Sequence, residues 1–202
     1  EYRAAAKSGI KVFYDCRALE LIREDGRVTG VRAEQNGRPV QFRAKSVVLA
    51  SGGFEANREW RTRYLGPGWD LAKVRGSRYN TGDGIQMGLN AGGQSYGQWS
   101  GCHSVSWERN APDFGDIAFH GQFNRNGYPF SLMINAEGNR FVDEGSDLRN
   151  YTYAKFGRAV LAQTGSYAWH VFDSQVTPIL HDEYKNKGAT RVQADTLEEL
   201  VK

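Results

Sequence analysis

The sequence of 202 residues has only two cysteines, Cys16 and Cys102, and they lie far apart. Two distant cysteines form neither the paired spacing of a zinc site nor a disulfide framework, so a reducing compartment, the cytoplasm, is the expected location. Long apolar runs are also absent, and none approaches the roughly 20 residues that a membrane-spanning helix needs. These absences argue against a zinc module, a disulfide-rich domain and a membrane-spanning segment.

The excess of positive charge is also small: the sequence has 26 Lys and Arg residues and 23 Asp and Glu residues, which gives a net charge of +3. Such a balance does not predict a nucleic-acid-binding surface. The spacing of the histidines predicts no metal site, and each of them is interpreted first as structural: His103, His120, His170 and His181. Hydrophobic residues make up 40% and charged residues 24%, which is typical of a globular protein with a real core.

The first half of the sequence predicts a helix, a β-meander and a buried strand. Asp25-Gly26 and Asn36-Gly37 are strong signals for tight turns between antiparallel strands. The apolar run Lys45–Ala50 is typical of a strand that is buried on both faces. The other expected elements are a helix over 1–8 with Gly9 as its cap, strands that begin near 10 and 18, strands over 28–34 and 40–42, and helices over 57–64 and 81–91.

The second half has weaker periodicity, and a passage into a second domain is expected near residue 100. Residues 131–135 and 140–144 are interpreted as a hairpin in which Arg140 makes a surface ion pair with Asp143 or Glu144. A helix over 151–163 and a strand over 167–172 follow. Thr196-Leu-Glu-Glu199 is a capping-box pattern close to the end, which favours a chain that is an internal fragment of a longer protein.

Three motifs could carry chemistry. Ala50-Ser51-Gly52-Gly53-Phe54 follows the predicted buried strand, where glycines let a backbone approach a ligand closely, although a plain turn is the alternative. Asn80–Gly88 contains Thr-Gly-Asp-Gly, which is either an ordinary capped helix start, with Thr81 or Asp83 as the cap, or an anion-facing one. Arg149 lies just before a predicted helix, where a cation is unfavourable to the helix dipole, and it is either functional or simply solvated.

The order of these motifs resembles a known family. KSVVLASGGFEAN, YNTGDGIQMGLNAGG, SGCHS, LMINAEGNRFVDE and LRNYTYAKFGRAVLAQ look like the flavoproteins that include fumarate reductases and succinate dehydrogenases. WSGCHS and DLRNYTYAKFG resemble the tricarballylate dehydrogenase branch in particular. The resemblance implies an α/β (α+β) fold, in which residues 1–100 are part of a Rossmann-like FAD-binding domain with a β-meander. Residues 101–202 would then be a mixed α+β capping domain that closes over the substrate.

The resemblance also implies roles for single residues. It places five residues next to FAD: Ala18, Ala50, Gly52, Gly53 and Asp83. His103 matches a histidine that binds a substrate carboxylate, although Ser104-Val105 follows it where the family has Pro-Thr. Arg149 falls near an arginine that serves as a proton donor, with one residue more between it and Glu144 than in fumarate reductases.

The function implied is FAD-dependent oxidation of tricarballylate, or of a similar polycarboxylate, to its alkene. A protein or a quinone would accept the electrons. The alternatives are a fumarate or urocanate reductase, a ketosteroid dehydrogenase on the same scaffold, and a non-catalytic binding module. Because the family's Gly-x-Gly-x-x-Gly fingerprint is absent from this sequence, we expect the fragment alone to bind little flavin and to be inactive.

Overall fold

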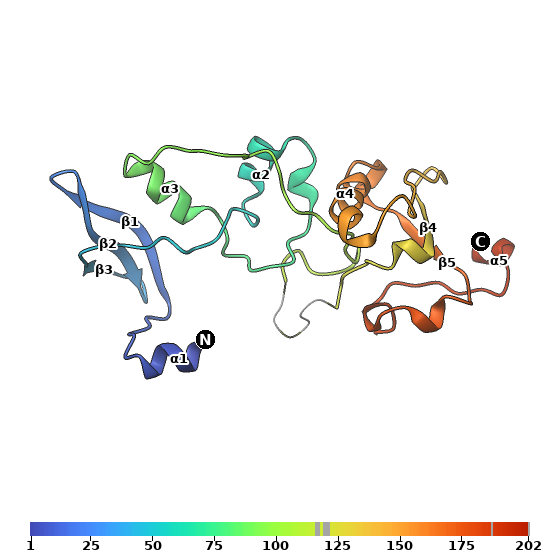
Figure 1. Cartoon of the computed structure of the whole chain (residues 1–202), viewed down its shortest axis with the longest axis horizontal. Coiled ribbons are helices and arrows are strands. Elements are labelled where there is room, and N and C mark those ends of the chain that lie inside the picture. The colour runs from blue at the N-terminus through green and yellow to red at the C-terminus, as the bar shows by residue number, and fades with distance from the viewer. Residues whose placement is uncertain (116–117, 119–121, 187, 202) are drawn as a thin grey trace. The chain divides into compact units, whose positions relative to one another are not determined.

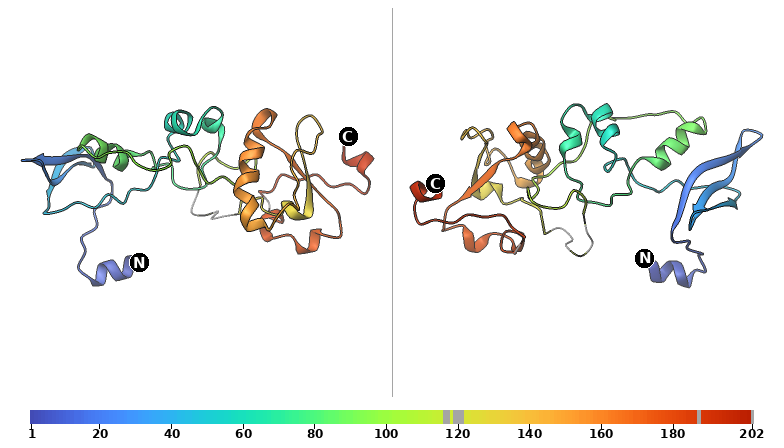
Figure 2. Two further views of the ribbon diagram at one scale, coloured as in Figure 1. Left: turned by 45° about the horizontal axis from the view of Figure 1, so that its top comes forward. Right: turned by 180° about the vertical axis from the view of Figure 1, so that it is seen from behind.

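The computed structural model describes residues 1–115, 118, 122–186 and 188–201. One histidine of the sequence analysis, His120, lies outside the described residues. Contacts divide the chain into two compact units, and each is described by itself (Figures 1 and 2). The first unit comprises residues 1–54 and 80–97, and the second comprises residues 55–79 and 98–202. The predicted passage between domains near residue 100 stays a prediction.

The first unit is built on a β-meander, drawn in blue in Figure 1. Its strands β1 (Cys16–Glu24), β2 (Arg27–Gln35) and β3 (Arg38–Arg43) pair antiparallel in the order β1-β2-β3. Both connecting turns have two successive residues with positive φ, from 48° to 76°. This backbone matches the twist of the strands and suits Asp-Gly and Asn-Gly, so the predicted meander and its turns are confirmed.

Two helices complete the first unit, α1 (Tyr2–Lys7) and α3 (Asp83–Asn90). Gly9, which has a φ of 69°, follows the end of helix α1 and terminates it, as predicted. The Gly9 amide donates to the Ala6 carbonyl and the Ile10 amide donates to the Ala5 carbonyl, so the last carbonyls are satisfied by a Schellman motif. Helix α3 packs against β1.

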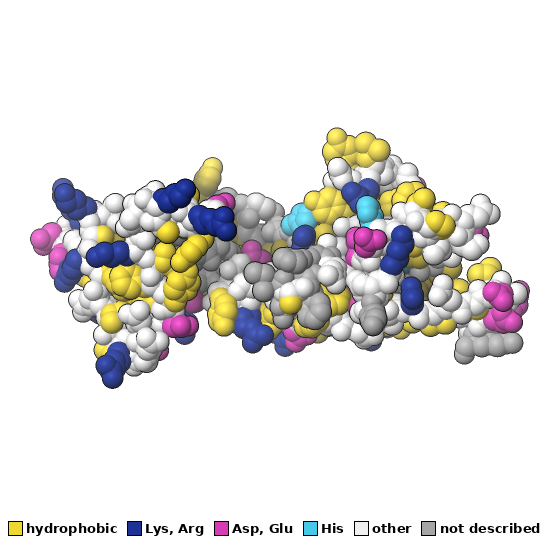
Figure 3. Space-filling view, turned by 90° about the horizontal axis from the view of Figure 1, so that it is seen from below, with side chains coloured by type: hydrophobic (Ala, Val, Ile, Leu, Met, Phe, Trp, Pro, Cys, Tyr) yellow, Lys and Arg dark blue, Asp and Glu magenta, His cyan; other side chains and the backbone are white. Residues whose placement is uncertain are grey.

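Two strand predictions in this unit are wrong. Residues 10–14 and 45–50 have no strand pairing in the described part of the chain. A strand needs a neighbour for its backbone groups, and apolar composition alone does not supply one. The side chains therefore stay exposed, as Val48 does at 86% of its surface. Figure 3 shows that hydrophobic side chains reach the surface of the molecule among lysines and arginines.

The second unit contains most of the buried apolar side chains. Helix α2 (Arg58–Leu65) confirms the helix predicted over 57–64, and the Asn57 side chain caps it by accepting from the Trp60 amide at 3.1 Å. Helix α4 (Arg149–Leu161) supplies Phe156, which packs against Tyr128 and Met133 in a fully buried cluster. The remaining elements are β4 (Ser131–Ile134), β5 (Trp169–Phe172), α5 (Leu197–Leu200) and the short 3₁₀ helices η1 (Trp69–Leu71), η2 (Tyr128–Phe130), η3 (Thr164–Ser166), η4 (Thr177–Ile179) and η5 (Asp182–Tyr184).

The predicted hairpin is wrong in its pairing. Strand β4 pairs antiparallel with β5, and only a single bridge joins Ile134 to Arg140. Glu144 is the reason, because its buried carboxylate accepts from the Met133 amide at 2.6 Å and from the Arg140 guanidinium at 2.8 Å. The ion pair of Arg140, which was predicted to lie on the surface, therefore has one buried partner, Glu144. Burial alone would raise the pKa of Glu144, but these hydrogen bonds outweigh burial and lower it.

A buried ion pair ties together distant parts of the second unit. The Glu108 carboxylate accepts from Nη2 of Arg125 at 2.6 Å and from Oγ1 of Thr190 at 2.6 Å. Arg125 also donates to the Glu183 carbonyl. A buried carboxylate is tolerated only when its charge is paired and hydrogen-bonded, and here it is both.

Candidate functional site

The glycine motif and the start of α3 come together in the first unit. The Gly82 amide donates to the Gly53 carbonyl at 3.0 Å. A Cβ on Gly84 would lie 2.0 Å from Oγ of Ser51, and one on Gly52 would lie 3.3 Å from the Asn80 side chain. A side chain at Gly84 would therefore require the Ser51 hydroxyl to move, and glycine is favoured at Gly52, whose φ is 76°. The two motifs form one continuous backbone surface.

Asp83 lies at this surface as the first residue of α3. Gly82, with a φ of 87°, is the N-cap, and no side chain caps the helix, so the predicted cap by Thr81 or Asp83 is wrong. The Asp83 carboxylate accepts instead from Nη2 of Arg17 on β1 at 3.3 Å. Both side chains are substantially exposed, at 71% for Arg17 and 42% for Asp83. An acidic group and a basic group are thus presented beside the glycine backbone.

The other residues predicted to contact the cofactor also lie in the first unit. Ala18 follows Arg17 on β1 and pairs with Ala33 of β2. Ala50 is exposed and precedes the glycine turn. The structure therefore brings Gly52, Gly53 and Asp83 together, and it places Ala18 on the strand whose Arg17 contacts Asp83. Their contact with FAD stays a prediction.

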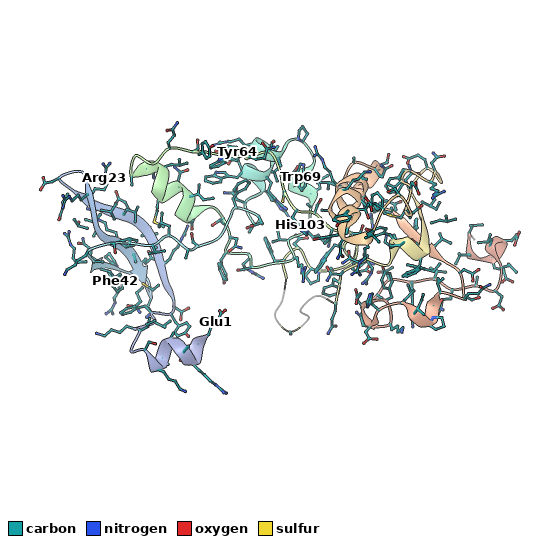
Figure 4. The ribbon with its side chains drawn as sticks, in the orientation of Figure 1. Glu1, Arg23, Phe42, Tyr64, Trp69 and His103 are labelled. Atoms are coloured by element: carbon teal, nitrogen blue, oxygen red, sulfur yellow. The ribbon has the colours of Figure 1, made fainter. Side chains whose placement is uncertain are left out.

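His103 and Arg149 are both associated with α4 in the second unit. Nε2 of His103, which Figure 4 labels, lies 2.7 Å from the Tyr153 hydroxyl, and the two rings meet edge to face with their centroids 4.9 Å apart. Arg149 is the exposed first residue of α4. Because residues four apart lie on one face of a helix, Arg149 and Tyr153 are neighbours there. Tyr153 thus contacts His103, predicted to bind substrate, and lies one helical turn after Arg149, predicted to be catalytic.

Close packing holds the His103 segment against α4. Oγ of Ser104 donates to the Ala154 carbonyl at 2.9 Å. A Cβ on Gly157 would lie 2.6 Å from the Val105 amide nitrogen, so only glycine permits this approach. Ser104-Val105, which stands where the family has Pro-Thr, is therefore the part of the segment that contacts α4.

Tyr153 and Tyr128 are the residues that sequence reasoning missed. The buried Tyr128 hydroxyl donates to the Arg149 carbonyl at 3.0 Å and lies 2.6 Å from Oγ1 of Thr152. Burial raises the pKa of Tyr128, so its hydroxyl stays protonated. The available signal was the spacing of Tyr153 four residues after Arg149, which puts both on one helix face.

Within the described ranges, no group of three or more His, Cys, Asp or Glu side chains could hold a metal ion. None of the helices in the part of the chain that the structure describes combines the length and apolar character needed to cross a membrane.

The comparisons with known proteins identify the family. A family model described as an FAD-binding domain matches residues 2–197. The chain belongs to this FAD-binding family. It is 31% identical over its whole length to a cytochrome-type fumarate reductase of Shewanella frigidimarina, of which the match covers 33%. A 3-oxosteroid 1-dehydrogenase of Mycolicibacterium smegmatis is 27% identical over 84% of the chain and 30% of that relative.

A solved structure supports the same assignment. The open conformation of a flavocytochrome c3 fumarate reductase superposes with a TM-score of 0.67 at 27% identity, over 89% of this chain and 30% of that chain. The predicted family, its flavin cofactor FAD and the mixed α/β fold class are thereby confirmed. The chain spans about a third of the length of these FAD-dependent relatives.

Proposed function

We propose that the protein containing this chain is an FAD-dependent oxidoreductase that removes hydrogen from a CH–CH bond beside a carboxylate. The preferred substrate is tricarballylate or a similar polycarboxylate, which becomes the corresponding alkene. The observation that carries the proposal is that Tyr153 of α4 contacts His103 and lies one helical turn after Arg149, so two groups that can bind carboxylates lie at the same helix. Family membership supplies the oxidoreductase class.

The residues of the first unit fit FAD. The exposed backbone at Ala50 and Gly52 carries little or no side chain, so a planar ring could lie against it. The Asp83 carboxylate beside it could accept from a ribose hydroxyl or a ring N–H. Ala18 and Gly53 complete the set of residues that would hold the cofactor. When bound, FAD supplies the acceptor for the hydride that leaves the substrate.

The residues of the second unit would orient the substrate and handle the proton. The His103 imidazole would donate a hydrogen bond to one carboxylate. The Arg149 side chain would lie beside a second carboxylate and stabilise negative charge on the carbon from which the proton leaves. In oxidation its neutral guanidine form would take up that proton and become a guanidinium, and in alkene reduction the guanidinium would return the proton to the carbon. A capping unit of this kind would exclude water from the reacting bond.

The runner-up is reductase activity on fumarate or urocanate, and it is favoured by the identity to the fumarate reductase of Shewanella frigidimarina. A ketosteroid dehydrogenase is favoured by the similarity to 3-oxosteroid 1-dehydrogenases. A non-catalytic binding module would keep the flavin and lack turnover. We further propose a protein or a quinone as electron acceptor, and a cytoplasmic location.

A substrate screen on the complete, FAD-loaded protein tests the proposal. Tricarballylate with an artificial electron-accepting dye should give turnover, whereas a 3-oxosteroid should give none. Reduction of fumarate by a reduced dye, without oxidation of tricarballylate, would favour the reductase. Turnover of the steroid alone would overturn the carboxylate proposal, and bound FAD without any turnover would favour the binding module.

A further inference from the structure

The contact between His103 and Tyr153 has a geometry that can control the histidine ring. The hydroxyl lies 2.7 Å from Nε2, and the rings meet at an interplanar angle of 67°. A phenol hydroxyl can both donate and accept, so it can pair with Nε2 whether or not that nitrogen carries a proton. Among the described residues this is the hydrogen bond that the imidazole makes, so Nδ1 is the nitrogen left for another ligand.

Tyr153 is itself held firmly. It lies half-buried on α4, one residue after Thr152, which is buried. The first turn of α4 is tied to Tyr128 by two hydrogen bonds, and the Tyr128 ring meets Phe156 edge to face at 4.9 Å. The hydroxyl of Tyr153 is therefore presented from a helix that is anchored to the main buried cluster.

Arg149 shares the same anchor. Its carbonyl accepts from Tyr128, and its side chain begins one helical turn before Tyr153. The packing of Gly157 against the backbone of residues 104–105 fixes the approach of the His103 segment to this helix. The backbone of Arg149 and the segment that carries His103 are therefore both held against α4.

We propose that Tyr153 is a positioning residue that holds the His103 ring so that Nδ1–H faces a carboxylate of the substrate. When Nε2 accepts from the phenol, the neutral ring carries its proton on Nδ1, and the imidazolium carries one there as well. The donor toward the substrate is thus present in both charge states. This inference rests on the proposed function, because it assigns the carboxylate as the ligand of His103.

The test is Tyr153→Phe in the complete FAD-loaded enzyme. Loss of one hydrogen bond to a binding group should raise KM for the carboxylate about five- to tenfold, with kcat changed less than about twofold. Tyr151→Phe is the matched control, since Tyr151 lies on the same helix with 74% of its surface exposed, and KM should not change. In a His103→Ala background, Tyr153→Phe should change KM less than about twofold, because its effect passes through His103.

A tautomer measurement separates this inference from the proposed function. In ¹⁵N-histidine-labelled holoenzyme, the His103 resonances, assigned by their loss in His103→Gln, should report a proton on Nδ1. In Tyr153→Phe they should shift toward a mixture of both tautomers. An unchanged spectrum, or an equal KM effect of Tyr153→Phe with and without His103, would overturn the positioning role even if carboxylates are turned over. If the spectrum shifts but the enzyme does not act on carboxylates, the contact between Tyr153 and His103 stands. The carboxylate is then not the ligand of His103, and the proposed function is refuted.

Discussion

The two units differ in how much apolar surface each one buries. Among the described residues, the buried hydrophobic side chains of the first unit are Ile22, Ala33 and Met87. The second unit has nine such residues, and the most buried are Tyr128, Met133 and Phe156. It also contains the buried ion pair Glu108–Arg125. Since apolar burial is the main favourable contribution to folding, the second unit should be the more stable of the two.

The same difference separates the two candidate sites. In the first unit the side chains near Asp83 are exposed, and glycine backbone lies beside them. A ligand there would therefore contact mainly backbone and not side chains that are held in place by a core. In the second unit His103 and Arg149 depend on a helix that is tied to the buried cluster. Changes in the core of the second unit should therefore affect both stability and substrate binding.

The largest effect is expected from Phe156→Ala. Removal of a fully buried ring should lower the free energy of unfolding of the second unit by about 3–5 kcal/mol, because the cavity cannot close completely. All five tryptophans lie in this unit, at positions 60, 69, 99, 107 and 169, so urea unfolding followed by tryptophan fluorescence reports on it. Val48→Ser in the first unit is the control and should not move that transition. A loss below about 1.5 kcal/mol would contradict the assignment of the core.

A smaller effect is expected from pH through His170. Burial, together with the positive charge of Arg125, lowers the pKa of His170 to about 4. The unfolded chain then binds more protons between pH 6.5 and 4, so stability is full above pH 6.5 and falls as the pH is lowered. Between pH 7.5 and pH 5 the second unit should lose about 2 kcal/mol by the same fluorescence measurement.

His170→Gln provides the comparison for this pH effect. The glutamine side chain does not titrate, so the loss between pH 7.5 and pH 5 should shrink to well under half of the unmodified value. An equal loss in the variant would assign the pH dependence to other groups.

The smallest effect is expected at the exposed pair Arg17–Asp83. Ion pairs that are open to solvent contribute about 0–1 kcal/mol, and salt screens them. Arg17→Ala should therefore lower the far-UV circular dichroism melting temperature of the first unit by no more than about 6 °C. A larger decrease would show that this pair holds α3 on β1, and the comparison between the units would need revision.

Local signals predicted much of the fold. Asp25-Gly26 and Asn36-Gly37 specify turns that few other dipeptides adopt, and the helix predicted over 57–64 forms as α2. The strand expected at 45–50 failed because strand formation depends on a partner that periodicity does not reveal. The hairpin failed because buried Glu144 uses the amide of Met133, a tertiary preference that has no local signature.

The candidate site was predictable to a similar degree. The two glycine-containing motifs that meet at the start of α3 stand out in the sequence, and the order of the motifs indicated the family. Tyr153 was missed because its role arises only when residues 103–105 pack over α4. Contacts between segments that lie 50 residues apart in the sequence depend on tertiary packing, and local sequence patterns do not predict that packing.

The central claim is that α4 presents Arg149 to the substrate while a separate set of residues holds FAD. Measurement of kcat and of bound flavin in the complete protein carrying Arg149→Gln tests it most directly. The account predicts a loss of turnover of at least about a thousandfold, with a stoichiometric flavin spectrum. Turnover within about tenfold of the unmodified enzyme would contradict it, as would loss of the flavin together with the activity.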